Sequence, residues 1–284
     1  MHHPGSSFVI LKQVDSTNNY AMAKVRTGLA NHGDAYFAMA QLKGKGQRGK
    51  TWVTQRGTNI IITLVMQPHN LLLPEQFKLS AAVALAAHDF FAHYAGEETF
   101  IKWPNDIYWR DRKAGGILIE SIIGSHESTE VNGQSSVISK EQVNSSVNST
   151  EERTAPPSPL LANSWKWAII GMGININQTS FPGHINNAVS LKQITGKDWD
   201  VIALAKELCG HVQNRYRQLQ DGIDLLPSYN NHLYKKGQTA KLKKGSRVFE
   251  GLIKEVNALG ELIVMTTIEE RFNFGEIQWV MGND

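Results

Sequence analysis

A glycine-rich stretch at residues 44–51, GKGQRGKT, narrows the choice of folds more than any other segment of this chain. It matches the phosphate-loop pattern G-x-x-x-x-G-K-[ST], and its first six residues match the dinucleotide-binding pattern G-x-G-x-x-G. Both motifs work by opening a helix, whose N-terminal amides and dipole hold the phosphate. Residues 52–59 instead have the composition of a loop, and residues 60–65 that of a strand. A phosphate-loop NTPase is therefore a weakened alternative, and a dinucleotide-binding fold is not indicated.

The same stretch keeps the physical properties of a phosphate cradle. Its three glycines let the backbone approach an anion closely, and Lys45, Arg48 and Lys50 supply positive charge. A flexible basic turn is the competing interpretation, and the segment by itself favours neither.

Strand-like and helix-like segments along the chain predict an α/β (α+β) fold in which helices back a mixed sheet. Strands are expected at residues 8–14, 35–41, 59–66, 99–103, 106–109, 116–123 and 165–177. Helices are expected from a cap at Asp15 or Ser16 to Gly28, from Pro74 to Tyr94, and over residues 201–219.

Residues 125–164 differ in composition from the segments around them. They include ten serines and no aromatic residue. Such a segment buries too little apolar surface to offset the entropy that ordering costs. We therefore expect a flexible hairpin insertion between two strands.

The composition changes again near Tyr234, where short strand-like runs alternate with glycines. The runs at 239–242, 247–256, 262–267 and 271–274 predict a small barrel. Five lysines make its first strand and turn basic, and they form either a solvated face or a binding patch. These lysines are Lys235, Lys236, Lys241, Lys243 and Lys244.

The overall composition is that of a globular protein with room for one large and one small domain, since 41% of its 284 residues are hydrophobic and 19% are charged. A net charge of only +3 does not imply a nucleic-acid partner. The single cysteine, Cys209, cannot form an internal disulfide, and the sequence shows neither a signal peptide nor a membrane span. A cytoplasmic location is expected.

Five motifs follow one another along the chain in a fixed order. They are DSTN at 15–18, the glycine stretch at 44–51, KWPNDIY at 102–108, KAGGILIE at 113–120 and GMGININ at 171–177. Each motif is weak alone, but their order and spacing resemble the catalytic domain of biotin protein ligases. Together with the C-terminal barrel, the resemblance covers nearly the whole chain.

The resemblance implies a class II synthetase-like biotin/lipoate ligase domain over residues 1–233 and an SH3-like β-barrel over residues 234–284. Bifunctional members of the family carry an N-terminal DNA-binding repressor domain, whereas the first catalytic strand is expected here at Phe8. The implied protein is the stand-alone ligase, with no DNA or membrane partner. Its oligomeric state, monomer or homodimer, stays open.

The implied activity joins biotin to a protein in two steps. Biotin is activated with ATP to biotinyl-5′-AMP and is then passed to a lysine of a biotin carboxyl carrier protein or domain, as in acetyl-CoA carboxylase. ATP and Mg²⁺ are the implied cofactors. Because two anions meet in the first step, catalysis depends on neutralising charge and on positioning. The resemblance assigns Lys113, beside the biotin carboxylate, and Arg48 as catalytic residues.

The resemblance also assigns the binding residues. Ser16, Thr17 and Gln41 match positions that meet the ureido ring. The full set expected at biotin is Ser16, Thr17, Asn18, Gln41, Lys45, Gly46, Gln47, Lys113 and Gly116. The set expected at ATP and the adenylate is Gly44, Lys45, Gly46, Arg48, Gly49, Lys50, Trp52 and Asn175. Asp106 either holds Mg²⁺ on the phosphates or helps to deprotonate the incoming lysine.

Some of these residues have other interpretations. Ser16 and Thr17 suit an ordinary helix cap, Lys113 a solvated turn, and Trp52 a buried core. Gln47 departs from the pattern of the well-known bacterial form, which has arginine there, and lysines replace arginine at positions 45 and 50. These departures predict weaker retention of the adenylate.

Two further functions compete with the ligase. A lipoate or octanoate ligase shares the fold, although the transferase branch of that family uses a cysteine nucleophile and Cys209 lies in no such motif. The other alternative is a binding module built on the basic barrel, without catalysis, whose affinity for nucleic acid would fall steeply with salt.

Overall fold

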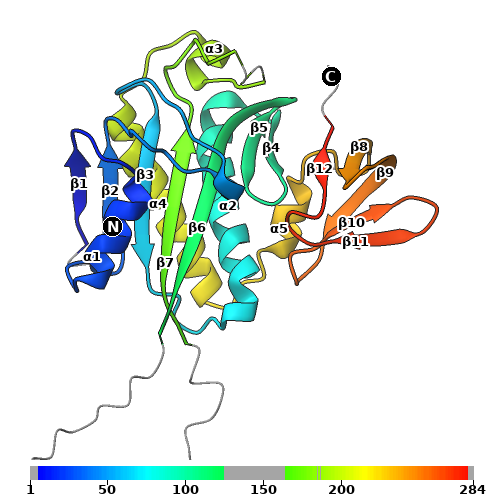
Figure 1. Cartoon of the computed structure of the whole chain (residues 1–284), viewed down its shortest axis with the longest axis horizontal. Helices are drawn as coiled ribbons and strands as arrows, with labels where there is room; N and C mark the ends of the chain where they lie inside the picture. Colours follow the sequence, from blue (N-terminus) through cyan, green and yellow to red (C-terminus); the bar gives the residue numbers. More distant parts are fainter. Residues whose placement is uncertain (1–5, 125–163, 184, 186, 281–284) are drawn as a thin grey trace, which may run out of the picture.

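The computed structural model describes residues 6–124, 164–183, 185 and 187–280, which form two β-sheets lying side by side (Figure 1). The larger sheet has seven strands in the order β1-β2-β3-β7-β6-β5-β4. Its strands are β1 (Phe8–Leu11), β2 (Ala35–Ala38), β3 (Ile60–Met66), β4 (Thr99–Lys102), β5 (Asp106–Trp109), β6 (Arg112–Gly124) and β7 (Ser164–Ile174). The β1–β2 pair is parallel and the other pairs are antiparallel, so the sheet is mixed.

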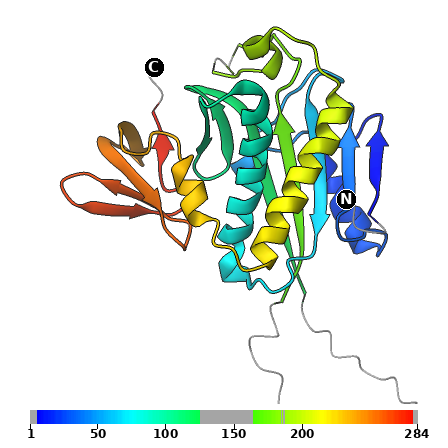
Figure 2. The same ribbon diagram turned by 180° about the vertical axis from the view of Figure 1, so that it is seen from behind.

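Helices cover both faces of the larger sheet. The helices are α1 (Thr17–Arg26), α2 (Gln76–Ala95), α3 (Leu191–Thr195), α4 (Val201–Gln220) and α5 (Leu226–Asn231), with short 3-10 turns η1 (Gln47–Gly49) and η2 (Leu73–Glu75). Helix α1 lies on one face, and α2 and α4 lie on the other, as Figure 2 shows from behind. All seven residues of β3 are buried, because this strand has neighbours on both sides and helices on both faces.

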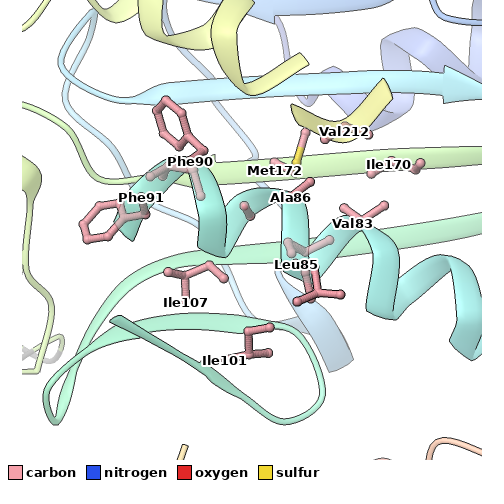
Figure 3. Packing of buried hydrophobic residues seen from close by; sticks show 14 of the residues in the cluster. Val83, Leu85, Ala86, Phe90, Phe91, Ile101, Ile107, Ile170, Met172 and Val212 are labelled. Atoms are coloured by element: carbon pink, nitrogen blue, oxygen red, sulfur yellow. The ribbon is translucent and has the colours of Figure 1, made fainter. Parts of the chain in front are cut away.

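The main core lies between α2 and the larger sheet. Helix α2 is rich in alanine, and small side chains let the helix pack closely on the strands. Its longer residues, Val83, Leu85 and Phe90, pack with Ile107 and Met172 from the sheet (Figure 3). This packing fixes the positions of the central strands that carry the predicted motifs.

The smaller sheet is antiparallel and forms the C-terminal barrel, in the order β11-β10-β9-β8-β12. Its strands are β8 (Thr239–Lys244), β9 (Arg247–Val256), β10 (Leu262–Met265), β11 (Glu269–Phe272) and β12 (Gln278–Trp279). Asn230 of α5 donates to the carbonyl of Val256 at 2.8 Å and accepts from its N–H at 2.7 Å. Trp103 Nε1 donates to the carbonyl of Gly260 at 2.9 Å. These contacts hold the barrel against the larger sheet.

The predicted fold class is confirmed, with differences at the ends of elements. The strand expected at 8–14 ends at Leu11, and the strand expected at 116–123 begins at Arg112. Helices α3 and α5 and strand β12 were not predicted. The boundary between domains after residue 233 stays a prediction. No helix in the described parts of the chain is long and apolar enough to span a membrane.

The predicted insertion at 125–164 lies outside the described residues except at its end. Ser164 does not belong to an insertion, because it pairs with Gly124 as the first residue of β7.

Candidate active site

Three of the predicted motifs meet at one end of the central strands, the upper end of β6 and β7 in Figure 1. The strand register pairs Asp106 of β5 with Gly116 of β6, and Gly116 with Gly173 of β7. Residues paired across neighbouring strands lie side by side. The KWPNDIY, KAGGILIE and GMGININ motifs therefore form one row of residues across the sheet.

A β-bulge turns the side chain of Lys113 toward this row. The register of the β5–β6 pair shifts between Ile107 and Tyr108, which leaves Ala114 as an extra residue. Without the bulge, the two-residue period of a strand would place Lys113 and Gly116 on opposite faces. A Cβ built on Gly116 would lie 3.4 Å from Nζ of Lys113, so both residues point to the same side.

Lys113 and Asp106 form an ion pair in this row. Nζ of Lys113 lies 2.7 Å from Oδ2 of Asp106, and each side chain is 30% exposed. The other carboxylate oxygen faces Gly116, because a Cβ built there would lie 3.2 Å from Oδ1. Lys113 is therefore not the fully solvated turn residue that the sequence alone also allowed.

The indole of Trp52 lies beside this ion pair. A Cβ built on Gly173 would lie 2.5 Å from ring atom Cε2, and Nζ of Lys113 lies 5.7 Å from the ring centroid. Nε1 of Trp52 is buried and has no hydrogen-bond partner among the described residues. Since buried indole N–H groups usually have a partner, this donor is suited to meet an acceptor on a bound molecule.

The glycine loop folds as a tight turn, η1, and the described residues 50–59 contain no helix before β3 begins. The expected departure from both phosphate-binding motifs is confirmed. The N–H of Trp52 donates to the carbonyl of Gly44 at 2.9 Å. A Cβ on Gly44 would collide with the carbonyl oxygen of Trp52, so glycine is required at this position. The loop is a folded turn with defined hydrogen bonds.

The three cations of the loop point in different directions. Lys45 donates to Oδ1 of Asn19 at 2.6 Å, and the guanidinium of Arg48 lies against Gly275 of the barrel. Lys50 is exposed and is close enough to contribute to the lowered pKa of Lys102. The structure does not bring the three cations to a single point, as a simple cradle would require.

Gln47 lies between the loop and the sheet. Its Nε2 donates to the carbonyl of Ile117 on β6 at 3.4 Å, which is a long hydrogen bond. The side chain is therefore close to the row of residues around Gly116, and the contact that holds it there is weak.

The residues predicted to meet the ureido ring lie at the start of α1. The N–H and Oγ1 of Thr17 both donate to Oε1 of Gln41, at 2.7 and 3.1 Å. Ser16 occupies the N-cap position, but its side chain makes no cap hydrogen bond, so the expected capping role is wrong. Ser16 and Thr17 are 1% and 3% exposed, and the structure brings them together with Gln41.

Asn18 is buried within the protein's own hydrogen bonds. Its Nδ2 donates to Glu120 at 2.8 Å, and its Oδ1 accepts from Oγ1 of Thr63 at 2.7 Å. A Cβ on Gly171 would collide with Oδ1. Both ends of the amide are therefore engaged between α1 and the sheet, which supports a positioning role.

Asn175 is 4% exposed and joins the central hairpin to the segment before α3. Its Nδ2 donates to the carbonyl of Val189 at 3.2 Å and more weakly to that of Lys113 at 3.4 Å. The donor half of the amide is used inside the protein, so an adenine contact would have to use the acceptor half or displace one of these bonds.

Lys102 was quoted within a motif but was given no role. It is 7% exposed and is enclosed by aromatic rings, with its Nζ donating to the hydroxyl of Tyr108 at 3.0 Å and lying 5.5 Å from the ring of Trp279. Burial lowers the pKa of Lys102 to about 8, against the opposing effect of Asp106. The sequence could have indicated a role for Lys102, because this lysine is the first residue of the KWPNDIY motif.

The predicted alternative of a cysteine nucleophile can be judged from burial. Cys209 is 2% exposed, and burial raises the pKa of its thiol to about 12, so it is not a nucleophile. A cavity of about 510 Å³ lies elsewhere, against Phe77, Leu225 and Ala258, and none of the predicted site residues lines it. Among the described residues, no group of three or more metal-ligating side chains is present.

Comparison with known proteins shows which proteins this chain resembles in sequence. The model of the biotin/lipoate A/B protein ligase family matches residues 10–133. A biotin--[acetyl-CoA-carboxylase] ligase of Paracoccus denitrificans is 39% identical over 115 residues, which are 39% of this chain and 46% of that protein. The bifunctional ligase/repressor BirA of Escherichia coli is 31% identical over 116 residues, 41% of this chain and 35% of that protein. Over these residues, the chain is similar to the biotin/lipoate A/B protein ligase family.

The fold agrees with this family over a longer range. The biotin protein ligase of Aquifex aeolicus, solved with biotin and ATP, superposes with a TM-score of 0.70 at 21% identity and covers 96% of this chain and 98% of that one. The matched sequence spans less than half the length of either curated relative named above. At this identity, the comparison shows that the two proteins share a fold over nearly the whole of both chains.

Proposed function

We propose that this protein is a biotin protein ligase that makes biotinyl-5′-AMP from biotin and ATP and transfers biotin to a lysine of a biotin carboxyl carrier domain. The observation that carries the proposal is the Lys113–Asp106 ion pair at 2.7 Å, set beside Gly116 and the indole of Trp52. A cation, a carboxylate, an open glycine backbone and an apolar wall are the groups needed to hold an acyl adenylate. The names of the relatives from Paracoccus denitrificans and Aquifex aeolicus support it.

In the first step, an oxygen of the biotin carboxylate attacks the α-phosphorus of ATP. The new bond joins that oxygen to phosphorus, and the bond between the α-phosphorus and the bridging oxygen breaks to release pyrophosphate. Lys113 holds the carboxylate and stabilises negative charge as the adenylate forms, and Lys50 and Lys102 add positive potential nearby. Arg48 is the second catalytic residue of the proposal, acting from the glycine loop.

In the second step, a neutral lysine amine of the carrier domain attacks the adenylate carbonyl. A C–N bond forms, the C–O bond to AMP breaks, and the amine loses a proton. The carboxylate of Asp106 is partly exposed and lies beside Lys113, which supports a role in accepting that proton as one of its two proposed roles. In this reading, Lys113 must shift away from Asp106 as the substrate carboxylate binds.

The biotin body is proposed to lie between the start of α1 and the central strands. Thr17 and Gln41 hold each other in place, and Ser16 adds a hydroxyl with no cap bond to make. These groups combine donors and acceptors, as a ureido ring requires. Gly46 and Gly49 are proposed to let the loop backbone approach the adenylate.

Mg²⁺ is proposed as a cofactor that neutralises the phosphates of ATP. Asp106 is the carboxylate that would hold it, and one carboxylate with several phosphate oxygens and waters is an ordinary Mg²⁺ environment. The described residues fit the ion in this form and not as a cage of several side chains. We place the protein in the cytoplasm, since its one cysteine is buried and unpaired.

The deciding experiment is exchange of labelled pyrophosphate into ATP, run separately with biotin, lipoate and octanoate and without any carrier protein. We expect exchange with biotin and none with the other acids. Exchange with lipoate or octanoate instead would move the protein to the other branch of its family. No exchange with any acid, from folded protein with Mg²⁺ present, would overturn adenylation. Labelling of a carrier domain with biotin then tests the transfer step.

A further inference from the structure

The guanidinium of Arg48 lies face-on against a turn of the C-terminal barrel. A Cβ built on Gly275 would lie 3.1 Å from Cζ of Arg48 and 3.3 Å from each of its two terminal nitrogens. These nearly equal distances mean that the absent side chain of Gly275 would point at the centre of the guanidinium plane. The loop and the barrel therefore touch at a point where a side chain on residue 275 would press against the guanidinium.

The backbone of Arg48 is strained. It adopts φ 54° and ψ 40°, in the left-handed region that residues other than glycine, asparagine and aspartate seldom occupy. A residue stays in that region only when its surroundings hold it there. Around Arg48, the N–H of Gly46 donates to the carbonyl of Lys50 and the N–H of Lys50 to that of Gln47, and the exposed side chain also lies against the turn at Gly275.

The barrel turn is itself rigid. The N–H of Asn273 donates to the carboxylate of Glu276 at 3.1 Å, and the N–H of Glu276 returns a bond to the carbonyl of Asn273 at 3.1 Å. The rings of Phe274 and Trp103 meet edge to face, with centroids 6.4 Å apart. Trp103 also donates to the carbonyl of Gly260, so the turn packs against the segment between β4 and β5 that leads to Asp106.

We propose that the barrel turn at residues 273–276 positions Arg48 for the reaction, with Gly275 as the positioning residue, and thereby sets how long the acyl adenylate is retained. The inference rests on the proposed ligase function and deepens it. Gly275 does not touch the substrate in this account. It acts by leaving room for the guanidinium, so that the loop folds over the site in one defined conformation.

The test compares Gly275→Ala with Gly245→Ala. Both glycines have a positive φ, 88° and 58°, so alanine strains the backbone at each, but nothing lies within 4 Å of a Cβ on Gly245. We expect Gly275→Ala to release labelled biotinyl-5′-AMP about three- to tenfold faster than wild type, the size expected from losing one contact. Gly245→Ala should release it at the wild-type rate. Equal release from both variants would overturn the proposal.

A second measurement needs no substrate. Hydrogen–deuterium exchange of the peptide over residues 44–52 should be faster in Gly275→Ala than in Gly245→Ala, in protein without ligands. This result still tests the contact even if the wild-type protein forms no adenylate, in which case the proposed function fails separately. Unchanged exchange in Gly275→Ala would show that the turn does not restrain the loop.

A coupling experiment covers the case in which Gly275→Ala alters the barrel more widely. If Gly275 acts through Arg48, adding Gly275→Ala to Arg48→Ala should cause no further increase in adenylate release. An additive increase in the double variant would mean that the turn acts by another route, and it would overturn the proposal.

Discussion

The ammonium of Lys113 lies 2.7 Å from the carboxylate of Asp106, although the two residues come from neighbouring strands and are brought to one face only by a β-bulge. This ion pair holds the ammonium of Lys113 beside the place where an anionic substrate is proposed to bind. The pairing also means that the charge of Lys113 becomes available when a substrate carboxylate replaces Asp106.

Removing the Lys113 ammonium should impair the chemistry more than binding. We expect Lys113→Ala to lower the rate of pyrophosphate exchange by roughly 10² to 10³, the usual loss for one transition-state contact, with a smaller change in the KM for biotin. Lys192→Ala is a matched control, because Lys192 also forms a 2.7 Å ion pair, with Asp198, outside the site. A loss of similar size in both variants would contradict the role of Lys113.

Asp106→Asn should separate the two roles open to this carboxylate. The amide keeps the shape but loses the charge, so we expect at least about a tenfold loss in overall biotin transfer. If Asp106 is a metal ligand, Asp106→Asn should need a higher Mg²⁺ concentration than wild type for half-maximal pyrophosphate exchange. A general base would leave that value unchanged and alter the pH dependence of transfer to the carrier. Wild-type behaviour in both assays would exclude both roles.

Gly173→Ala should disturb the proposed adenylate site by displacing Trp52. A Cβ on Gly173 would lie 2.5 Å from the indole ring, so the ring must move. We expect a raised KM for ATP and a shift in tryptophan fluorescence. Gly210→Ala, in the middle of α4 with nothing within 4 Å, should instead keep activity and raise the free energy of unfolding by about 0.5–1 kcal/mol. Normal ATP affinity in Gly173→Ala would contradict the proposal that the indole of Trp52 forms one wall of the adenylate site.

Lys102 should make the stability of this protein depend on alkaline pH. Its pKa is lowered from 10.5 to about 8 in the folded protein, chiefly by burial. The unfolded chain then binds more protons between pH 8 and 10.5, so this residue's destabilising effect is complete below pH 8 and disappears as the pH rises through that window. The effect is of the order of 3 kcal/mol.

Urea unfolding of wild type and Lys102→Met at pH 7 and pH 10 measures this effect. We expect the stability of wild type to rise relative to that of the variant between the two pH values. A difference that stays constant with pH would show that the pKa of Lys102 is not lowered by folding.

Gln47→Arg should slow the loss of the adenylate. Gln47 makes one long hydrogen bond, at 3.4 Å to the carbonyl of Ile117, so an arginine in its place can reach a phosphate at little cost. The measurement is the rate at which labelled biotinyl-5′-AMP leaves each protein. Equal rates would remove the idea that this position weakens retention.

The sequence predicted which motif residues lie close together better than it predicted contacts between distant parts of the chain. The motifs predicted Lys113, Asp106 and Trp52 as site residues, and the structure brings their side chains together, while their roles stay predictions. The bulge at Ala114 could not be foreseen, because it depends on how β5 pairs with β6. The enclosure of Lys102 depends on Tyr234 and Trp279, which come from the far end of the chain.

Short elements were missed for a different reason. Helices α3 and α5 have five and six residues, too few for a helical period to show in the sequence. The helix cap expected at Ser16 was wrong because the composition of a cap site does not reveal whether the hydroxyl turns toward the helix. The contact of Arg48 with Gly275 left no local signal, since it joins a loop to a barrel turn.

The central strands β6 and β7 are long, so the end of β6 at Gly124 lies far from the Lys113–Asp106 ion pair. Gly116, beside the ion pair, and Gly124, where β6 ends, are eight residues apart on one strand, which corresponds to about 25 Å. Gly124 and Ser164 therefore lie at the end of the sheet remote from the ion pair. A fluorescent reporter or an affinity tag inserted between Gly124 and Ser164 should leave Lys113 and Asp106 undisturbed. This end of the hairpin is therefore a practical site for attaching the protein to other molecules.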